Sequence, residues 1–157
     1  MMHGPRLRTA SLGTLGAALV LSLAAISGCS TLEAAVDRTA YCRPEDPVVT
    51  PQRVAPGDEL HIETSGREDG VDCEPRMPAR ARYAVSIMSS VGGYSASLGV
   101  LNPSSDGAAQ GTVQIPDDIP IGRAEVLLVL GNAKTLCELD PSASCAKNPF
   151  ALIDVTD

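Results

Sequence analysis

The sequence predicts an all-β protein, an antiparallel sandwich of about seven strands that follows an N-terminal signal and anchor segment. Three observations lead to this fold class. Short stretches alternate apolar with polar side chains, which is the period of a half-buried strand. Clusters of Gly, Pro, Asn and Asp separate these stretches every 8–12 residues or so, as in sandwiches and barrels. The hydrophobic core is expected to consist of Val, Ile, Leu and Ala side chains, because aromatic residues make up only 3% of the chain.

The expected strands can be placed along the chain from these patterns. In order, they cover residues 48–50, 59–64, 81–88, 94–101, 111–115, 124–130 and 150–155. Prolines at 47 and 51 flank the first strand and assign it to a sheet edge, since proline is excluded from sheet centres. In the second, Leu60 and Ile62 alternate with His61 on the opposite face.

The sixth expected strand, 124–130, is apolar on both faces and therefore suits the centre of a sheet. A buried helix of similar length is the alternative. It is disfavoured by the valines of this stretch and by the glycines at 122 and 131. We therefore interpret 124–130 as a central strand.

The first 28 residues have the layout of a secretory signal peptide. Arg6 and Arg8 form a basic start, and residues 10–26 form an apolar run that is interrupted only by small residues. The run ends in Ile26-Ser27-Gly28-Cys29, which resembles the bacterial lipobox: an aliphatic residue and two small ones before a cysteine. The resemblance implies that the Cys29 thiol receives a diacylglyceryl group and that cleavage makes Cys29 the mature N-terminus.

Two other interpretations of this segment compete with the lipobox. An uncleaved transmembrane helix needs about 20 apolar residues, and this run is shorter and diluted by Gly and Ser. A plain signal peptide would leave Cys29 for a disulfide, but five cysteines is an odd number for an exported domain. We therefore expect a lipid anchor on Cys29 that attaches the protein to the cell membrane, facing the extracytoplasmic side.

These assignments divide the chain into three parts. Residues 1–28 form the signal peptide, residues 29–43 the lipidated N-terminus and tether, and residues 44–157 the β-sandwich domain. Only two lysines occur against ten arginines, and Ala, Gly and Pro are abundant. In this amino-acid composition the chain resembles short actinobacterial lipoproteins.

Local patterns also resemble bacterial immunoglobulin-like domains. Residues 54–62 (VAPGDELHI) resemble their first hairpin, and residues 111–116 (GTVQIP) with 119–126 (IPIGRAEV) resemble their penultimate strand pair. The resemblance implies an immunoglobulin-like sandwich. The chain lacks the tryptophan of antibody domains, and Cys42 and Cys73 lie outside the expected strands, so the antibody-type disulfide between sheets is not implied.

Without Cys29, four cysteines remain: Cys42, Cys73, Cys137 and Cys145. Four cysteines allow three pairings. The chain before the first strand and the loop after the second lie at one end of a sandwich, so we expect Cys42 to pair with Cys73. Cys137 and Cys145 share one loop and can close it. Redox and zinc motifs need much closer spacings or more histidines, so these cysteines are expected to be structural.

Charge and motif content exclude several functions. Residues 29–157 contain all 19 acidic residues and ten of the 12 basic ones, a formal charge of −9, which argues against nucleic acid as a partner. No phosphate-binding loop and no Gly-x-Ser-x-Gly elbow occurs. His61 is the only histidine after the signal peptide. We expect no catalytic residue, no metal ligand and no cofactor.

The sequence therefore predicts a non-enzymatic, lipid-anchored domain of the cell envelope with a binding or structural role, possible partners being other envelope proteins. Contacts are expected at the two cysteine-tied loops after the second and sixth strands, which should lie near the membrane, with residues 116–122 facing outward. The alternative is a small exported metal-binding protein or enzyme that uses His61 with the acidic loop 68–74.

Overall fold

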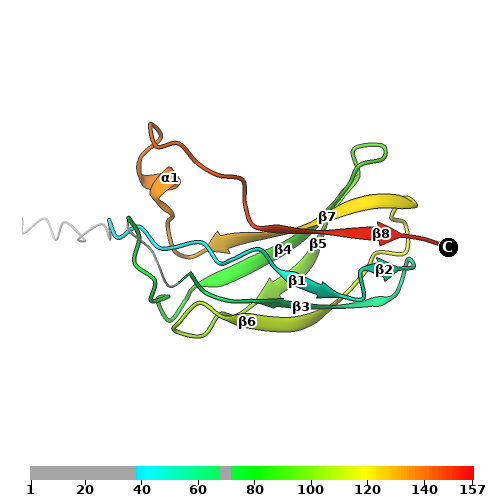
Figure 1. Cartoon of the computed structure of the whole chain (residues 1–157), viewed down its shortest axis with the longest axis horizontal. Coiled ribbons are helices and arrows are strands. Elements are labelled where there is room, and N and C mark those ends of the chain that lie inside the picture. The colour runs from blue at the N-terminus through cyan, green and yellow to red at the C-terminus, as the bar shows by residue number, and fades with distance from the viewer. Residues whose placement is uncertain (1–37, 68–71) are drawn as a thin grey trace, which may run out of the picture. The chain divides into compact units, whose positions relative to one another are not determined.

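The computed structural model describes residues 38–67 and 72–157, which form two β-sheets and one short helix (Figure 1). One sheet has the order β1-β3-β6 and the other the order β2-β8-β7-β4-β5. The strands are β1 (Val48–Thr50), β2 (Arg53–Val54), β3 (Glu59–Thr64), β4 (Arg82–Ser89), β5 (Ser95–Leu101), β6 (Ala109–Gln114), β7 (Gly122–Gly131) and β8 (Phe150–Val155). The helix α1 spans Leu136–Leu139.

The smaller sheet is antiparallel and centred on β3, which pairs with β1 on one side and β6 on the other. The side chains of β3 alternate strictly between exposed and buried. Leu60 and Ile62 are fully buried, whereas His61 is exposed on the outer face. The alternation that predicted this strand is therefore the division between core and solvent.

The larger sheet is built around β7, which pairs antiparallel with β4 and with β8. This confirms the central position expected for residues 124–130. The prediction of an antiparallel sandwich was incomplete in one respect. The two-residue strand β2 pairs with β8 in parallel, through Arg53 with Asp154 and Val54 with Val155.

The inward side chains of both sheets form one hydrophobic core. Leu60 and Ile62 from the smaller sheet meet Tyr83, Ile87 and Leu128 from the larger one, and all are fully buried. Each such side chain contributes about 1.5–3 kcal/mol when it leaves water. The Tyr83 hydroxyl is satisfied inside the core because it donates a hydrogen bond to the Gly107 carbonyl oxygen at 2.9 Å.

Strand directions place several loops at one end of the sandwich. β3, β5 and β7 end there, and β4, β6 and β8 begin there. We call this end the disulfide pole, and it comprises the described residues 38–47, 65–67, 72–81, 102–108 and 132–149. The opposite end carries the turns at 55–58, 90–94 and 115–121 and the C-terminus (Figure 1).

The predicted strands 48–50, 59–64 and 150–155 have the bounds seen in the structure, and the other four differ by at most two residues at each end. β2 and α1 were not predicted. The signal peptide, Cys29 and residues 30–37 of the tether lie outside the described residues. In the parts of the chain that the structure describes, no helix has the length and hydrophobicity needed to cross a bilayer.

Candidate functional site

The disulfide pole is organised by the N-terminal segment 40–46, which runs between the two cysteine-tied loops. The Cys42 N–H donates to the Glu74 carbonyl at 3.0 Å, and the Glu74 N–H donates to the Ala40 carbonyl at 2.7 Å. On the other side, the Tyr41 N–H donates to the Lys134 carbonyl at 2.8 Å. The last residues that the sequence assigned to the tether are thus fixed to the domain.

The Cys42–Cys73 disulfide holds this segment to the loop after β3. Cys42 is only 1% exposed. Further along, the Glu45 N–H donates to the Ser65 carbonyl at 3.0 Å, and the Thr64 hydroxyl donates to the Glu45 carbonyl at 2.7 Å. The disulfide is therefore one member of a ladder of contacts between the N-terminal segment and β3 with its following loop.

That loop also packs closely on the loop 102–108. The Met77 N–H donates to the Ser105 carbonyl at 2.9 Å. A Cβ atom at Gly66 would overlap the Asp106 carbonyl oxygen, so the close approach of these two backbones requires glycine at position 66. Loop 102–108 thus extends the same packed region.

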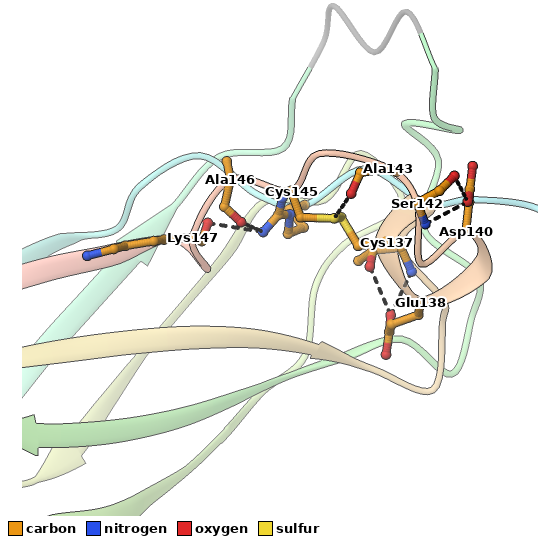
Figure 2. The surroundings of a disulfide bond; sticks show 10 residues. Cys137, Glu138, Asp140, Ser142, Ala143, Cys145, Ala146 and Lys147 are labelled. Carbon is orange, nitrogen blue, oxygen red and sulfur yellow. Dashed lines mark hydrogen bonds between the residues drawn. A yellow bond between two sulfur atoms is a disulfide. The ribbon is translucent and has the colours of Figure 1, made fainter.

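The Cys137–Cys145 disulfide closes the loop after β7 on itself (Figure 2). Cys137 is half-buried and Cys145 is exposed. The helix α1 begins after Thr135, and the Glu138 carboxylate accepts hydrogen bonds from the Thr135 N–H at 2.7 Å and hydroxyl at 3.0 Å. Thr-x-x-Glu is the capping-box pattern, so the sequence did contain a signal for this helix.

One arginine connects the stapled loop to the N-terminal segment. The Arg43 guanidinium donates to the carbonyl oxygens of Ala146 at 2.7 Å and Lys147 at 3.0 Å. Both carbonyls lie just after Cys145 in the returning arm of the loop (Figure 2). The two disulfides, which are far apart in the sequence, are in this way joined through residues 42 and 43 at one end of the sandwich.

A hollow of about 590 Å³ lies between the stapled loop and the outer face of the larger sheet. Its floor is formed by Met88 of β4 and by Leu127 and Val129 of β7. Charged side chains of both signs lie around it: Arg43, Lys147, Glu125 and Glu138. An apolar floor with a mixed charged rim is suited to binding a partner rather than to a single ionic ligand.

Hydrogen bonds set the ionisation of two carboxylates in the pole. The Ser142 hydroxyl at 2.6 Å and N–H at 2.9 Å lower the pKa of Asp140. The Ser104 hydroxyl and the Ala108 N–H lower the pKa of Asp106 in the same way. Both side chains therefore keep their negative charge to lower pH and fix the turns that contain them.

The structure describes most, but not all, of the residues that the sequence analysis singled out. Both disulfide pairings, Cys42 with Cys73 and Cys137 with Cys145, agree with the sequence prediction. His61 lies on β3 between Thr50 and Thr112 of the neighbouring strands. In the acidic loop, Glu68 and Asp69 lie outside the described residues. Within residues 38–67 and 72–157, no group of three or more His, Cys, Asp or Glu side chains is placed to hold a metal ion.

The comparisons add no relative from which a function could be transferred: no family model, curated protein or solved structure matches this chain.

Proposed function

We propose that this protein is a lipid-anchored, extracytoplasmic domain with an immunoglobulin-like fold and a non-enzymatic binding or structural role in the cell envelope. The observation that carries the proposal is the use of its cysteines. The four cysteines after Cys29 pair with one another in two disulfides, which leaves Cys29 available for acylation. Disulfides are typical of exported proteins, and Cys29 directly follows a signal-peptide layout.

The order of the strands supports the immunoglobulin-like part of the proposal. Named in chain order A, A′, B, C, C′, E, F and G, the eight strands give one sheet A-B-E and a second sheet A′-G-F-C-C′. This order is similar to that of an immunoglobulin-type sandwich, in which the B and E strands face the C, F and G strands, and we take the similarity as support for the proposed fold. Such sandwiches have many unrelated roles, so the fold alone does not indicate a function. The binding role is proposed from the predicted anchor on Cys29 and from the hollow with an apolar floor at the disulfide pole.

Firm attachment follows from the number of acyl chains. Each buried methylene contributes about 0.8 kcal/mol, and two chains hold a protein stably where one does not. From Cys29 to Ala40, where the first described backbone contact to the domain is made, the chain can span at most ~40 Å. The disulfide pole is therefore the end of the domain nearest the membrane in this proposal.

The test is replacement of the acylated cysteine in the full chain. In a bacterial host fed a clickable palmitic acid analogue, the wild-type protein is expected in the membrane fraction and labelled. Cys29→Ser is expected to be unlabelled and to leave that fraction. Ser27→Ala, which keeps a small residue before the cysteine, is the matched control and should behave as wild type. A Cys29→Ser protein that stays labelled contradicts the proposal.

A further inference from the structure

A second hollow lies away from the disulfides, along the seam between the two sheets. It has a volume of about 550 Å³ and runs between β1 and β8. We call it the β1–β8 groove. It is lined by Pro47, Val48, Val49, Gln52, Arg123, Phe150, Ala151, Leu152, Ile153 and Asp154. It exists because β1 pairs with β3 in one sheet while only the two residues of β2 pair with β8 in the other.

The backbone of β8 presents hydrogen-bonding groups to this groove. The Asp154 N–H points away from β7, since it donates to the Gln52 carbonyl at 2.9 Å. The Phe150 N–H also points away from β7 and donates to the Asp46 carboxylate at 3.2 Å. The pairing of β8 with β7 runs without a register shift. Because alternate residues of a strand direct their N–H and C=O to the same side, those of Leu152 point into the groove.

The Leu152 backbone has no partner there. Within residues 38–67 and 72–157, no hydrogen bond is made to its N–H or C=O. The two neighbouring N–H groups that point the same way each have a partner, because Phe150 donates to the Asp46 side chain and Asp154 donates to the Gln52 carbonyl. The Leu152 N–H is therefore an open donor between two donors that are already bonded.

We propose that the β1–β8 groove binds a short extended peptide segment of a partner protein, which adds to β8 as an extra strand and pairs with Leu152. Main-chain hydrogen bonds to a free strand edge are a recurring mode of peptide recognition. In an antiparallel arrangement, one peptide residue exchanges both of its backbone hydrogen bonds with Leu152.

The dimensions of the groove favour a peptide over the edge of a second copy of this chain. The open part of β8, from Phe150 to Ile153, is about 13 Å long at the rise of a strand. The β2 strand closes one end, and the segment that carries Asp46 closes the other. A few extended residues fit between these ends, whereas the continuous edge of another sheet is blocked by them.

The side chains around the groove define the chemistry of the segment. Val48 is 65% exposed and Leu152 is 46% exposed. Arg123 and Asp154 near one end bring both signs of charge, 3.8 Å apart, so neither charge selects the partner. The segment is therefore expected to be extended and uncharged, with apolar side chains that contact Val48 and Leu152, and without proline at the position that pairs with Leu152.

The experiment uses the full, isotope-labelled chain in detergent micelles and the blocked pentapeptide acetyl-Thr-Val-Leu-Val-Thr-amide. Nuclear magnetic resonance is expected to show shifts confined to β1 and β8, with slower hydrogen exchange of the Leu152 amide. The same peptide with an N-methyl group on its leucine lacks the central donor and should bind about fivefold more weakly.

Variants of the chain separate the groove from other surfaces. Val48→Asp should weaken binding, whereas Val100→Asp, at a similarly exposed valine on β5, should not. Leu152→Pro removes the open donor and should abolish binding. If that variant does not fold, Val48→Asp and the N-methyl peptide still decide. Shifts outside β1 and β8, equal binding of both peptides, or a Leu152 amide that responds to protein concentration instead of peptide would each overturn the inference.

The inference rests on the proposed binding role of the domain, but the two can fail separately. Peptide binding in micelles does not depend on acylation of Cys29. If the peptide does not bind to the β1–β8 groove but membrane attachment still requires Cys29, the proposed lipid anchor stands. Only the inference of a peptide partner is then wrong.

Discussion

The two disulfides of the disulfide pole differ in almost every physical respect. Cys42–Cys73 links residues 31 apart and includes a sulfur that is buried against the domain. Cys137–Cys145 links residues eight apart in a loop of largely exposed side chains. The first joins the N-terminal segment to the packed body of the sandwich, whereas the second shapes one surface loop. The first bond thus ties two separate parts of the fold together, whereas the second fixes the form of a single surface loop.

The surroundings of the bonds reinforce this difference. The Cys42 N–H donates a hydrogen bond to the Glu74 carbonyl. The loop that carries Glu74 is in turn hydrogen-bonded to loop 102–108 through Met77 and Ser105. The loop of Cys137 is held to the rest of the pole mainly by Arg43 and by the backbone contact of Lys134 to Tyr41. We therefore expect the first region to unfold with the whole domain and the second to open locally.

The largest expected effect comes from removing the buried disulfide. In the chain-entropy model, a 31-residue loop contributes about 3–4 kcal/mol and an eight-residue loop about 2–3 kcal/mol. The Cys42→Ala/Cys73→Ala variant should therefore lose more unfolding free energy than Cys137→Ala/Cys145→Ala. Denaturant unfolding of the two variants beside the wild type measures both losses.

Partial reduction offers a control for this comparison. A mild reductant followed by alkylation and mass spectrometry should label Cys137 and Cys145 before Cys42 and Cys73, because Cys145 is exposed and Cys42 is not. The comparison fails if the buried bond opens first, or if the loss of the short loop destabilises the domain more than the loss of the long one.

A smaller effect is expected from Tyr83, which supports the packed side of the pole from inside the core. Tyr83→Phe removes the hydrogen bond to the Gly107 carbonyl and should cost about 1 kcal/mol at neutral pH. Burial, followed by the nearby negative charge of Asp106, raises the pKa of Tyr83 to about 12. Its phenol therefore stays neutral in the folded protein at pH values where the unfolded chain ionises.

The sign of the pH dependence follows from linkage. Between pH 10, the ordinary pKa of tyrosine, and pH 12, the unfolded state binds fewer protons than the folded state, so the stability contributed by Tyr83 is complete below pH 10 and falls as the pH rises. Unfolding of the wild type should become easier over this range relative to Tyr83→Phe. Parallel curves for the two proteins would contradict the buried position of this hydroxyl in solution.

The sequence predicted those features best that leave a regular local pattern. The strands with a clean alternation, such as Glu59–Thr64 and Phe150–Val155, were placed correctly. In such strands every second side chain faces the core, so an apolar residue recurs at every second position. The disulfide pairings followed from which loops share an end of a sandwich. The anchor at Cys29 remains a prediction, since it lies outside the described residues.

Other features left too weak a local signal. The strand β2 has two residues, which is too few for any periodicity, and its parallel pairing with β8 depends on where the chain leaves one sheet for the other. The β1–β8 groove has the same origin. Its open position at Leu152 arises because Val48–Thr50 pairs with β3, so that no local pattern in either strand encodes it.

The smallest effect, and the sharpest test of the difference between the two loops, concerns the capping box of α1. Glu138→Ala removes the carboxylate that accepts hydrogen bonds from Thr135 and should destabilise this turn by about 0.5 kcal/mol. The expected result is faster hydrogen exchange of the Asp140 amide, which donates to the Leu136 carbonyl at 2.7 Å, with the global unfolding free energy unchanged.

Glu138→Gln is the matched control, because its amide oxygen can still accept both hydrogen bonds and exchange at Asp140 should stay near the wild-type rate. If Glu138→Ala instead lowered the global stability as much as it loosened the turn, the stapled loop would be part of the cooperative unit. The loop closed by the eight-residue disulfide would then unfold together with the domain instead of opening locally.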